Sequence, residues 1–309
     1  MSEYHGTDSI TSLDRRKVGF TSAGTLCAAW HYPGSNGACV VMAGGFAVTK
    51  EPGTDRFAAN FHEAGFGVLA FDYRGIGESG GRPRQVQRIK HQLADWDAAL
   101  AFAATLPDVD PTRIAAWGFS LSGGHIFRVA AGNSQLTAAI AQTPNADGPA
   151  ATRNAIRYQK PLAMARTMGR AVLDALGGLL GRPPRLIALD GPPGTVALLT
   201  TPDAAGGGDA LDPDGIYPDW QQAVAARSLL PIGLYRPGLA AANVRCPLLV
   251  VVCDDDRSAL AEPSVAAATR APRGELVRLP GGHYAPFLDQ HERAVEAELA
   301  FLRRELLDA

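Results

Sequence analysis

The sequence predicts an α/β fold with a mostly parallel β-sheet, and three observations support this prediction. Short apolar runs of strand length alternate with segments of helical periodicity, which is typical of β-α-β units. Most of these runs are continuously apolar, as expected for strands that helices cover on both faces. Turn residues are frequent, with 34 Gly and 22 Pro among 309 residues, and they separate the expected elements.

The first half of the chain keeps to the alternation of strand and helix. It begins with two strands joined by a turn at residues 22–24, which is a hairpin signal, and Gly65 ends the first helix. Strands joined by helices in this way form parallel sheets with right-handed crossovers. The expected strands are residues 17–20, 25–31, 39–42, 68–71, 114–117 and 138–141, and the expected helices are 55–64, 85–105 and one that follows residue 120.

The alternation stops between residues 148 and 243. Two helix-like segments at residues 150–168 and 170–180 are followed by a Pro- and Gly-rich passage, an apolar run at 195–200 and a possible helix at 219–229. A stretch of this length is too long for a loop. We therefore expect an inserted, mainly helical lid, with a partly disordered insertion as the alternative.

After this stretch the alternation resumes with two more strands and two more helices. They are expected at residues 247–253, 262–270, 275–279 and 285–307. The sequence therefore predicts an α/β core formed by residues 1–147 and 244–309, into which the lid of residues 148–243 is inserted.

The composition excludes several classes of protein. A net charge of −2 argues against a dedicated nucleic-acid surface. No run approaches the ~18 apolar residues of a membrane span, and the N-terminus lacks the pattern of a signal peptide. We therefore expect a cytoplasmic protein without stable membrane insertion that acts on a small molecule. The oligomeric state stays open, a homodimer included.

The cysteines and histidines show no metal-binding pattern. The four cysteines form no CxxC pair, and most of them lie in apolar runs, so we expect reduced core residues. No set of His, Cys and acidic residues has the spacing of a zinc site. The sequence therefore predicts neither a metal nor another cofactor.

The stretch of residues 113–125 shows the clearest sign of chemistry. A short apolar strand leads into Ser120, with small residues at Gly118 and Ser122, and residues that can begin a helix follow. A serine in this setting can occupy a tight, strained turn with its hydroxyl exposed. Because a serine hydroxyl is a poor nucleophile at neutral pH, catalysis also requires a histidine and an acid. An ordinary glycine-rich turn is the alternative.

Two later strand ends supply a histidine and an acid. Asp254, Asp255 and Asp256 follow the strand at residues 247–253, and His283 follows two glycines after the last strand. In an open parallel sheet, active residues gather at the carboxyl ends of the strands. Three acids at a strand end can also cap a helix, but the order Ser, Asp, His after three separate strands is much less expected by chance than any one motif.

These motifs resemble those of the α/β-hydrolase fold family over nearly the whole chain outside the insertion. The matching pieces are Gly44-Gly-Phe46, residues 71–79, the serine turn at 118–122, the acidic strand end and Gly281-Gly-His283. The resemblance implies a mostly parallel eight-stranded sheet flanked by helices. It also implies a serine hydrolase that cleaves a carboxylic ester or thioester through an acyl-enzyme.

The resemblance assigns roles to residues of this sequence. Ser120 corresponds to the nucleophile and His283 to the general base. Asp256 is the favoured acid because of its distance beyond the strand, and Asp254 is the second candidate. A serine nucleophile, rather than an aspartate, argues against epoxide hydrolase or haloalkane dehalogenase chemistry.

The oxyanion hole is implied by the same resemblance. Its two donors correspond to the backbone N–H groups of Phe46 and Leu121. Two positions depart from the family pattern: Gly44 and Gly45 replace the usual His-Gly, and Ser122 replaces the second glycine of the serine turn. These departures bear on which class of substrate the protein accepts more than on whether it is active.

The apolar residues of the lid predict the kind of substrate. Met164 and Met168 in the lid, together with Tyr284 beside the histidine, are expected to bind a small to medium apolar acyl or aryl group. Three alternatives keep the same residues but change the reaction, namely acyl transfer, lactone formation and hydrolysis of a carbon–carbon bond. A non-catalytic binding protein on the same scaffold is a further alternative.

Overall fold

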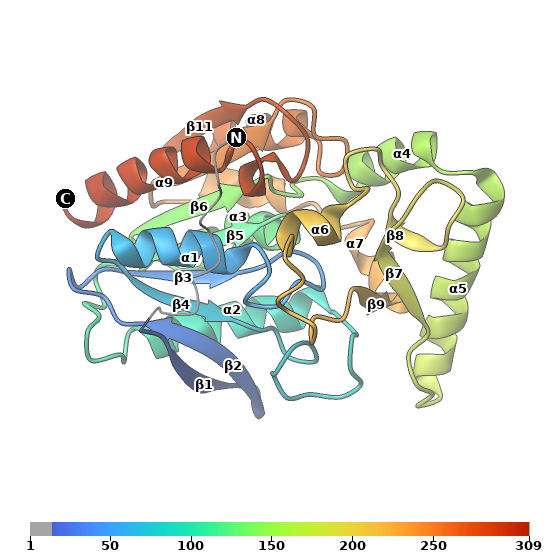
Figure 1. Ribbon diagram of the computed structural model, residues 1–309, viewed down its shortest axis with the longest axis horizontal. Helices are drawn as coiled ribbons and strands as arrows, with labels where there is room; N and C mark the ends of the chain where they lie inside the picture. The colour runs from blue at the N-terminus through green and yellow to red at the C-terminus, as the bar shows by residue number, and fades with distance from the viewer. Residues whose placement is uncertain (1–13, 309) are drawn as a thin grey trace.

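An eight-stranded β-sheet forms the centre of the protein (Figure 1). The computed structural model describes residues 14–308. The strands of the sheet are, in chain order, β1 (Arg16–Ser22), β2 (Thr25–Tyr32), β3 (Cys39–Ala43), β4 (Gly67–Phe71), β5 (Ile114–Phe119), β6 (Ala138–Gln142), β10 (Leu248–Cys253) and β11 (Gly274–Leu279). Their spatial order is β1-β2-β4-β3-β5-β6-β10-β11, antiparallel from β1 to β4 and parallel from β4 to β11. The mostly parallel sheet that the sequence predicts is therefore confirmed.

Helices cover both faces of this sheet, so that alternate residues of one strand belong to different cores. The flanking helices are α1 (Thr54–Glu63), α2 (Ile89–Ala103), α3 (Leu121–Gly132), α8 (Ala261–Arg270) and α9 (His291–Leu306). In β3, Val40 and Met42 pack in the core beneath α1 and α9, whereas Val41 packs in the core beneath α2, α3 and α8. Every residue of β3, β4, β5, β6 and β10 is buried, which explains their continuously apolar sequences.

Two of these helices begin later than the sequence predicts. α2 begins at Ile89, because Gln85 has a φ of 59°, which lies outside the helical region. α9 begins at His291, because the residues before it form a separate 3₁₀ turn, η4 (Ala285–Phe287), which ends at Leu288 with a ψ of −122°.

Residues 148–243, called the inserted segment below, add no strand to the main sheet. Most of the segment lies beside that sheet, toward the right of Figure 1. Its elements are α4 (Gly148–Tyr158), α5 (Pro161–Leu179), β7 (Leu186–Asp190), β8 (Ala197–Leu199), α6 (Gly207–Leu211), β9 (Ala223–Ala225), η2 (Ala226–Ser228), α7 (Leu229–Ile232) and η3 (Pro237–Asn243). The three strands form a small second sheet in the order β8-β7-β9, and η3 contacts α3 and α8 of the core.

Two predictions within the inserted segment are wrong. α5 runs through Gly169, and the break between the two helices lies at Gln159 and Lys160, because Pro161 disfavours a helical conformation in the residue before it. The helix predicted at residues 219–229 is instead strand β9 followed by the 3₁₀ helix η2. The segment thus contains a small sheet besides its helices.

All four cysteines are buried and free, as the sequence predicts. Within residues 14–308, no helix is both long and apolar enough to cross a membrane. No cluster of His, Cys, Asp and Glu that could hold a metal ion occurs in the same range.

Glu298 of α9 is a buried carboxyl group beneath the sheet. Its Oε2 lies 3.0 Å from the indole Nε1 of Trp117, which donates a hydrogen bond to it, and its Oε1 has no partner among the described residues. Burial raises the pKa of Glu298 well above its ordinary value. In the unfolded chain the same group ionises near pH 4.5. Folding therefore favours the protonated form.

Replacement of Glu298 by Gln should make the stability less dependent on pH. Because the pKa is higher in the folded state, the contribution of Glu298 to stability is greatest below pH 4.5 and falls as the pH rises, by up to about 1.4 kcal/mol per pH unit. Glu298→Gln removes this ionisation, so its gain in Tm over the wild type should grow between pH 5 and pH 8. Glu296→Gln, an exposed change on the same helix, is the control. A gain that is the same at both pH values would contradict the raised pKa.

Candidate active site

Ser120 lies in the tight turn between the end of β5 and the start of α3. Its φ is 56°, a left-handed conformation that is strained for a residue with a Cβ atom. A Cβ atom on Gly118 would lie 2.5 Å from the backbone oxygen of Ser122, so only glycine fits there. This crossing of strand and helix explains the small residues around Ser120 and presents its hydroxyl at the carboxyl end of the strand.

The hydroxyl of Ser122 joins the serine turn to the loop after β3. It donates a hydrogen bond to the carbonyl oxygen of Gly44, and it accepts one from the Tyr73 hydroxyl at 2.6 Å. The Tyr73 hydroxyl in turn accepts a hydrogen bond from Trp96 Nε1 at 2.7 Å. A glycine at position 122 makes no such bonds. Ser122 therefore fixes the loop that carries Phe46 against the serine turn.

The structure brings together Ser120, His283 and Asp256. His283 Nε2 lies 2.9 Å from Ser120 Oγ, and His283 Nδ1 lies 2.7 Å from Asp256 Oδ2. The other oxygen of Asp256 accepts hydrogen bonds from the backbone N–H groups of Ser258 at 2.8 Å and Ala259 at 2.7 Å. Both His283 and Asp256 are buried. Their side chains are therefore held in one orientation by packing and by hydrogen bonds.

The other two acids of the same run point elsewhere. Asp254 is exposed and pairs with Arg278 at 2.6 Å, and Asp255 is exposed as well. The chain turns back after β10, where Asp256 N–H bonds to the carbonyl oxygen of Cys253. Of the three acids, Asp256 alone faces His283.

The charges around His283 favour a protonated imidazole. Burial alone lowers the pKa of His283, but the Asp256 carboxylate and its hydrogen bond outweigh burial, and Asp203 acts in the same direction. The pKa is therefore raised above its ordinary value. Because the Asp256 carboxylate accepts from Nδ1, the neutral ring carries its proton there, and Nε2 is free to accept the proton of the Ser120 hydroxyl.

The backbone N–H groups of Phe46 and Leu121 lie beside Ser120. Neither group donates a hydrogen bond within the part of the chain that the structure describes. Leu121 is the first residue of α3, where the helix dipole favours negative charge. A Cβ atom on Gly45 would lie 3.2 Å from Ser120 Cβ, so the loop after β3 directly abuts the serine. The two free donors can stabilise a developing oxyanion.

A small cavity of about 60 Å³ opens beside the Ser120 hydroxyl. It is lined by Phe46, Ser120, Leu121, Asn145, Leu198, Leu199, Ile232, Ser258, Ala259 and His283. Leu198, Leu199 and Ile232 belong to the inserted segment, which therefore forms the apolar wall opposite the serine. The sequence did not single out these three residues: the apolar run at residues 195–200 contains Leu198 and Leu199, and no signal pointed to Ile232.

The three residues predicted to bind substrate lie elsewhere. Met164 and Met168 belong to α5, at the outer right edge of Figure 1, and neither lines the cavity. The Met168 side chain is 46% exposed. Tyr284 is buried against the rings of Phe119 and His283, behind the histidine rather than in the cavity. The prediction assumed that the longest apolar helix of the lid, α5, would face the serine. Instead, strand β8 of the small sheet and helix α7 face it.

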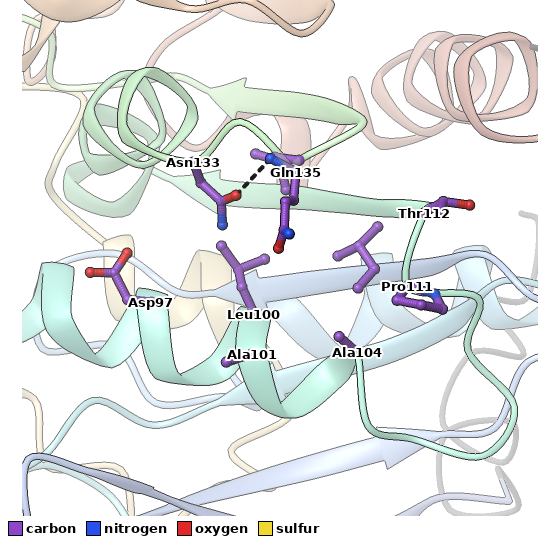
Figure 2. A pocket seen from close by; sticks show the side chains of 10 residues that line it. Asp97, Leu100, Ala101, Ala104, Pro111, Thr112, Asn133 and Gln135 are labelled. Atoms are coloured by element: carbon purple, nitrogen blue, oxygen red, sulfur yellow. Dashed lines mark hydrogen bonds between the residues drawn. The ribbon is translucent and has the colours of Figure 1, made fainter.

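A second hollow, of about 460 Å³, lies far from this site (Figure 2). It opens between α2 and the amino end of β5, where Leu100, Ala104 and Ile114 form its apolar wall. Its polar side includes the Asp97 carboxylate and Asn133, which accepts a hydrogen bond from the backbone N–H two residues later at 2.9 Å. The residues that line this hollow include no nucleophile paired with a base. The cavity at Ser120 is therefore the candidate active site.

Several known proteins are similar to this chain, one of them over nearly its whole length. A family model described as "Alpha/beta hydrolase family" matches residues 36–298. "Quorum-quenching protein AidA" of Acinetobacter baumannii (strain MDR-ZJ06) is 37% identical over 292 residues, which cover 93% of this chain and 94% of that protein. "Thiohydrolase" of Eupenicillium brefeldianum is 30% identical over 177 residues, covering 57% of this chain and 54% of that protein.

A solved structure has the same fold. The crystal structure of the alpha/beta hydrolase GrgF from Penicillium sp. sh18 superposes with a TM-score of 0.79 at 24% sequence identity, covering 95% of this chain and 99% of that one. The matched family model and the extent of the similarity to AidA agree with the sheet order and the serine turn described above. The chain therefore belongs to the alpha/beta hydrolase family.

Proposed function

We propose that this protein is a serine hydrolase that cleaves a carboxylic ester or thioester with an apolar acyl or aryl group. The observation that carries the proposal is the unbroken line of hydrogen bonds from Ser120, beside an apolar cavity, through His283 to Asp256. The relative named "Thiohydrolase" supports the inclusion of thioesters.

The geometry supports a reaction through an acyl-enzyme. Ser120 Oγ attacks the carbonyl carbon of the substrate while His283 Nε2 accepts the hydroxyl proton. The backbone N–H groups of Phe46 and Leu121 stabilise the negative charge on the carbonyl oxygen of the tetrahedral intermediate. The protonated His283, stabilised by Asp256, then gives its proton to the departing alcohol or thiol. A water molecule, deprotonated by His283, then attacks the acyl carbon. The bond to Ser120 Oγ breaks to release the acid, and His283 returns the proton to Oγ.

The cavity limits the substrate and its mode of entry. Its wall of Leu198, Leu199 and Ile232 favours an apolar group, because these side chains offer no hydrogen-bond partner. Its volume of about 60 Å³ is smaller than the ~300 Å³ or more of sites for small organic ligands. The cavity therefore has to widen when a substrate binds.

A fluorophosphonate probe and a substrate panel test the proposal together. We expect the probe to label one residue per chain, and peptide mass spectrometry to identify it as Ser120. A panel of p-nitrophenyl esters and acyl thioesters of increasing acyl length should show hydrolysis that the probe abolishes. Absence of both labelling and turnover would favour a binding protein, and acyl transfer would instead appear as a new ester when an alcohol is added.

A further inference from the structure

Asp203 is a carboxylate of the inserted segment that reaches two loops of the core. Its Oδ2 accepts hydrogen bonds from the backbone N–H groups of Arg257 at 2.7 Å, Ser258 at 3.2 Å and His283 at 3.3 Å. Its Oδ1 accepts one from the Ser258 hydroxyl at 3.0 Å. One side chain thus bonds both to the loop after β10, which carries Asp256, and to the loop after β11, which carries the histidine.

Neighbouring contacts show that this arrangement is tightly packed. A Cβ atom on Gly282 would lie 2.8 Å from Asp203 Cβ, so the loop after β11 approaches Asp203 as closely as glycine permits. The Thr201 hydroxyl lies 2.6 Å from Ser258 Oγ and donates to it, because Ser258 Oγ itself donates to Asp203. The turn after β8 therefore contacts the loop after β10 through two of its side chains.

We propose that Asp203 is a positioning residue that holds the loops of Asp256 and His283 together, so that the imidazole stays between its carboxylate partner and Ser120. The inference rests on the proposed function, because it concerns the alignment of the same three residues. Asp203 and Asp256 both accept from the Ser258 backbone N–H, at 3.2 and 2.8 Å, which couples the two carboxylates directly.

Asp203 also acts on His283 through its charge. Burial raises the pKa of Asp203, but the hydrogen bond from Arg257 N–H, the nearby His283 and the Ser258 hydroxyl outweigh burial. The pKa therefore lies below its ordinary value, and the carboxylate stays ionised at neutral pH. The charged groups that face His283 are Asp256 from the loop after β10 and Asp203 from the inserted segment, and both raise its pKa. Loss of Asp203 should therefore lower the pKa of the imidazole as well as loosen it.

Asp203→Asn tests this role, with Asp255→Asn as the matched control. Asn keeps the size of the side chain but removes the charge and one of the two acceptor atoms. We expect kcat/KM to fall by about 10- to 100-fold, because small displacements of a catalytic group have effects of this size. We also expect the acidic limb of the kcat/KM profile, which reports the pKa of the base in the free enzyme, to move to lower pH. Asp255→Asn, at an exposed position of the same loop, should match the wild type in both.

Ser258→Ala separates the two effects of Asp203. It removes the donor to Oδ1 but keeps the charge, so the pKa of His283 should stay at its wild-type value while kcat/KM falls. Because Ser258 also lines the cavity, the fall should be equal for short and long acyl groups, as expected for misalignment rather than for a lost substrate contact. If Asp203→Asn does not fold, this variant carries the test, and an unchanged kcat/KM would overturn the inference. Unchanged kcat/KM and an unchanged acidic limb in a folded Asp203→Asn protein would overturn it directly.

An NMR titration distinguishes failure of this inference from failure of the proposed function. The His283 imidazole signals, identified by their loss in His283→Gln, report its pKa without any substrate. A lower pKa in Asp203→Asn in a protein that hydrolyses no ester would reject the proposed function and leave the link between Asp203 and His283 intact. If hydrolysis depends on Ser120 but does not change when Asp203 is replaced, the inference is rejected and the proposed function stands.

Discussion

Ser120→Ala should lower kcat for ester hydrolysis by about 10⁵- to 10⁶-fold, the loss typical of removing a serine nucleophile. Without Oγ no acyl-enzyme forms, and the two free N–H donors of Phe46 and Leu121 account for the small activity that remains. The measurement is steady-state hydrolysis of the best ester of the panel, together with the fluorophosphonate labelling.

The fold of this variant should be unchanged. Alanine at position 120 carries the same Cβ atom as serine at a φ of 56°, so the backbone strain stays and the Tm should change little. Ser134→Ala, an exposed serine between α3 and β6, serves as the matched control and should keep full activity. Wild-type turnover by a folded Ser120→Ala protein would refute Ser120 as the nucleophile.

Asp256→Asn should have the second largest effect, a decrease in kcat of about 10⁴-fold. The amide group of asparagine can donate a hydrogen bond to Nδ1, which favours the tautomer whose Nε2 carries the proton and cannot accept one from Ser120. The buried imidazolium also loses the carboxylate that stabilises it. The pH profile of kcat/KM should shift as well, because Asp256 is the main group that raises the pKa of His283.

Asp254→Asn is the control that separates neighbouring acids. Asp254 is exposed and forms a surface ion pair with Arg278, an interaction worth about 1 kcal/mol or less. Its replacement should leave kcat within about twofold of the wild type. Equal losses in the two variants would mean that the acidic loop matters as a whole rather than through Asp256.

The strands of the core can be predicted from the sequence because their burial requires apolar residues at neighbouring positions. Strands β3, β4, β5, β6 and β10 are buried on both faces and so appear as unbroken apolar runs. Ser120 and the three acids are visible because they follow such strands, and His283 is visible because it follows two glycines after the edge strand β11. The choice among the acids required the turn after β10, whose hydrogen bond from Asp256 N–H to Cys253 orients the carboxylate.

The elements of the inserted segment are harder to predict from the sequence. Strands β8 and β9 span three residues each, too few for a period to appear, and their pairing joins residues distant in the chain. Leu198 of β8 and Ile232 of α7 both line the cavity although they lie far apart in the sequence, and no local pattern reports this. Asp203 was missed for the same reason, because its partners Arg257 and His283 lie far along the sequence.

The inserted segment supplies two things at once, the apolar wall and the Asp203 carboxylate. Exchange of the whole segment between relatives is therefore expected to change acyl preference and the alignment of His283 together. A chimera that takes the residues at positions 198 and 199 from a relative but lacks an acid at position 203 is expected to have a new acyl preference and a poorly aligned His283 imidazole. The serine turn lies between β5 and α3, outside the inserted segment, but η3 of that segment packs against α3, so an exchanged segment must keep this contact.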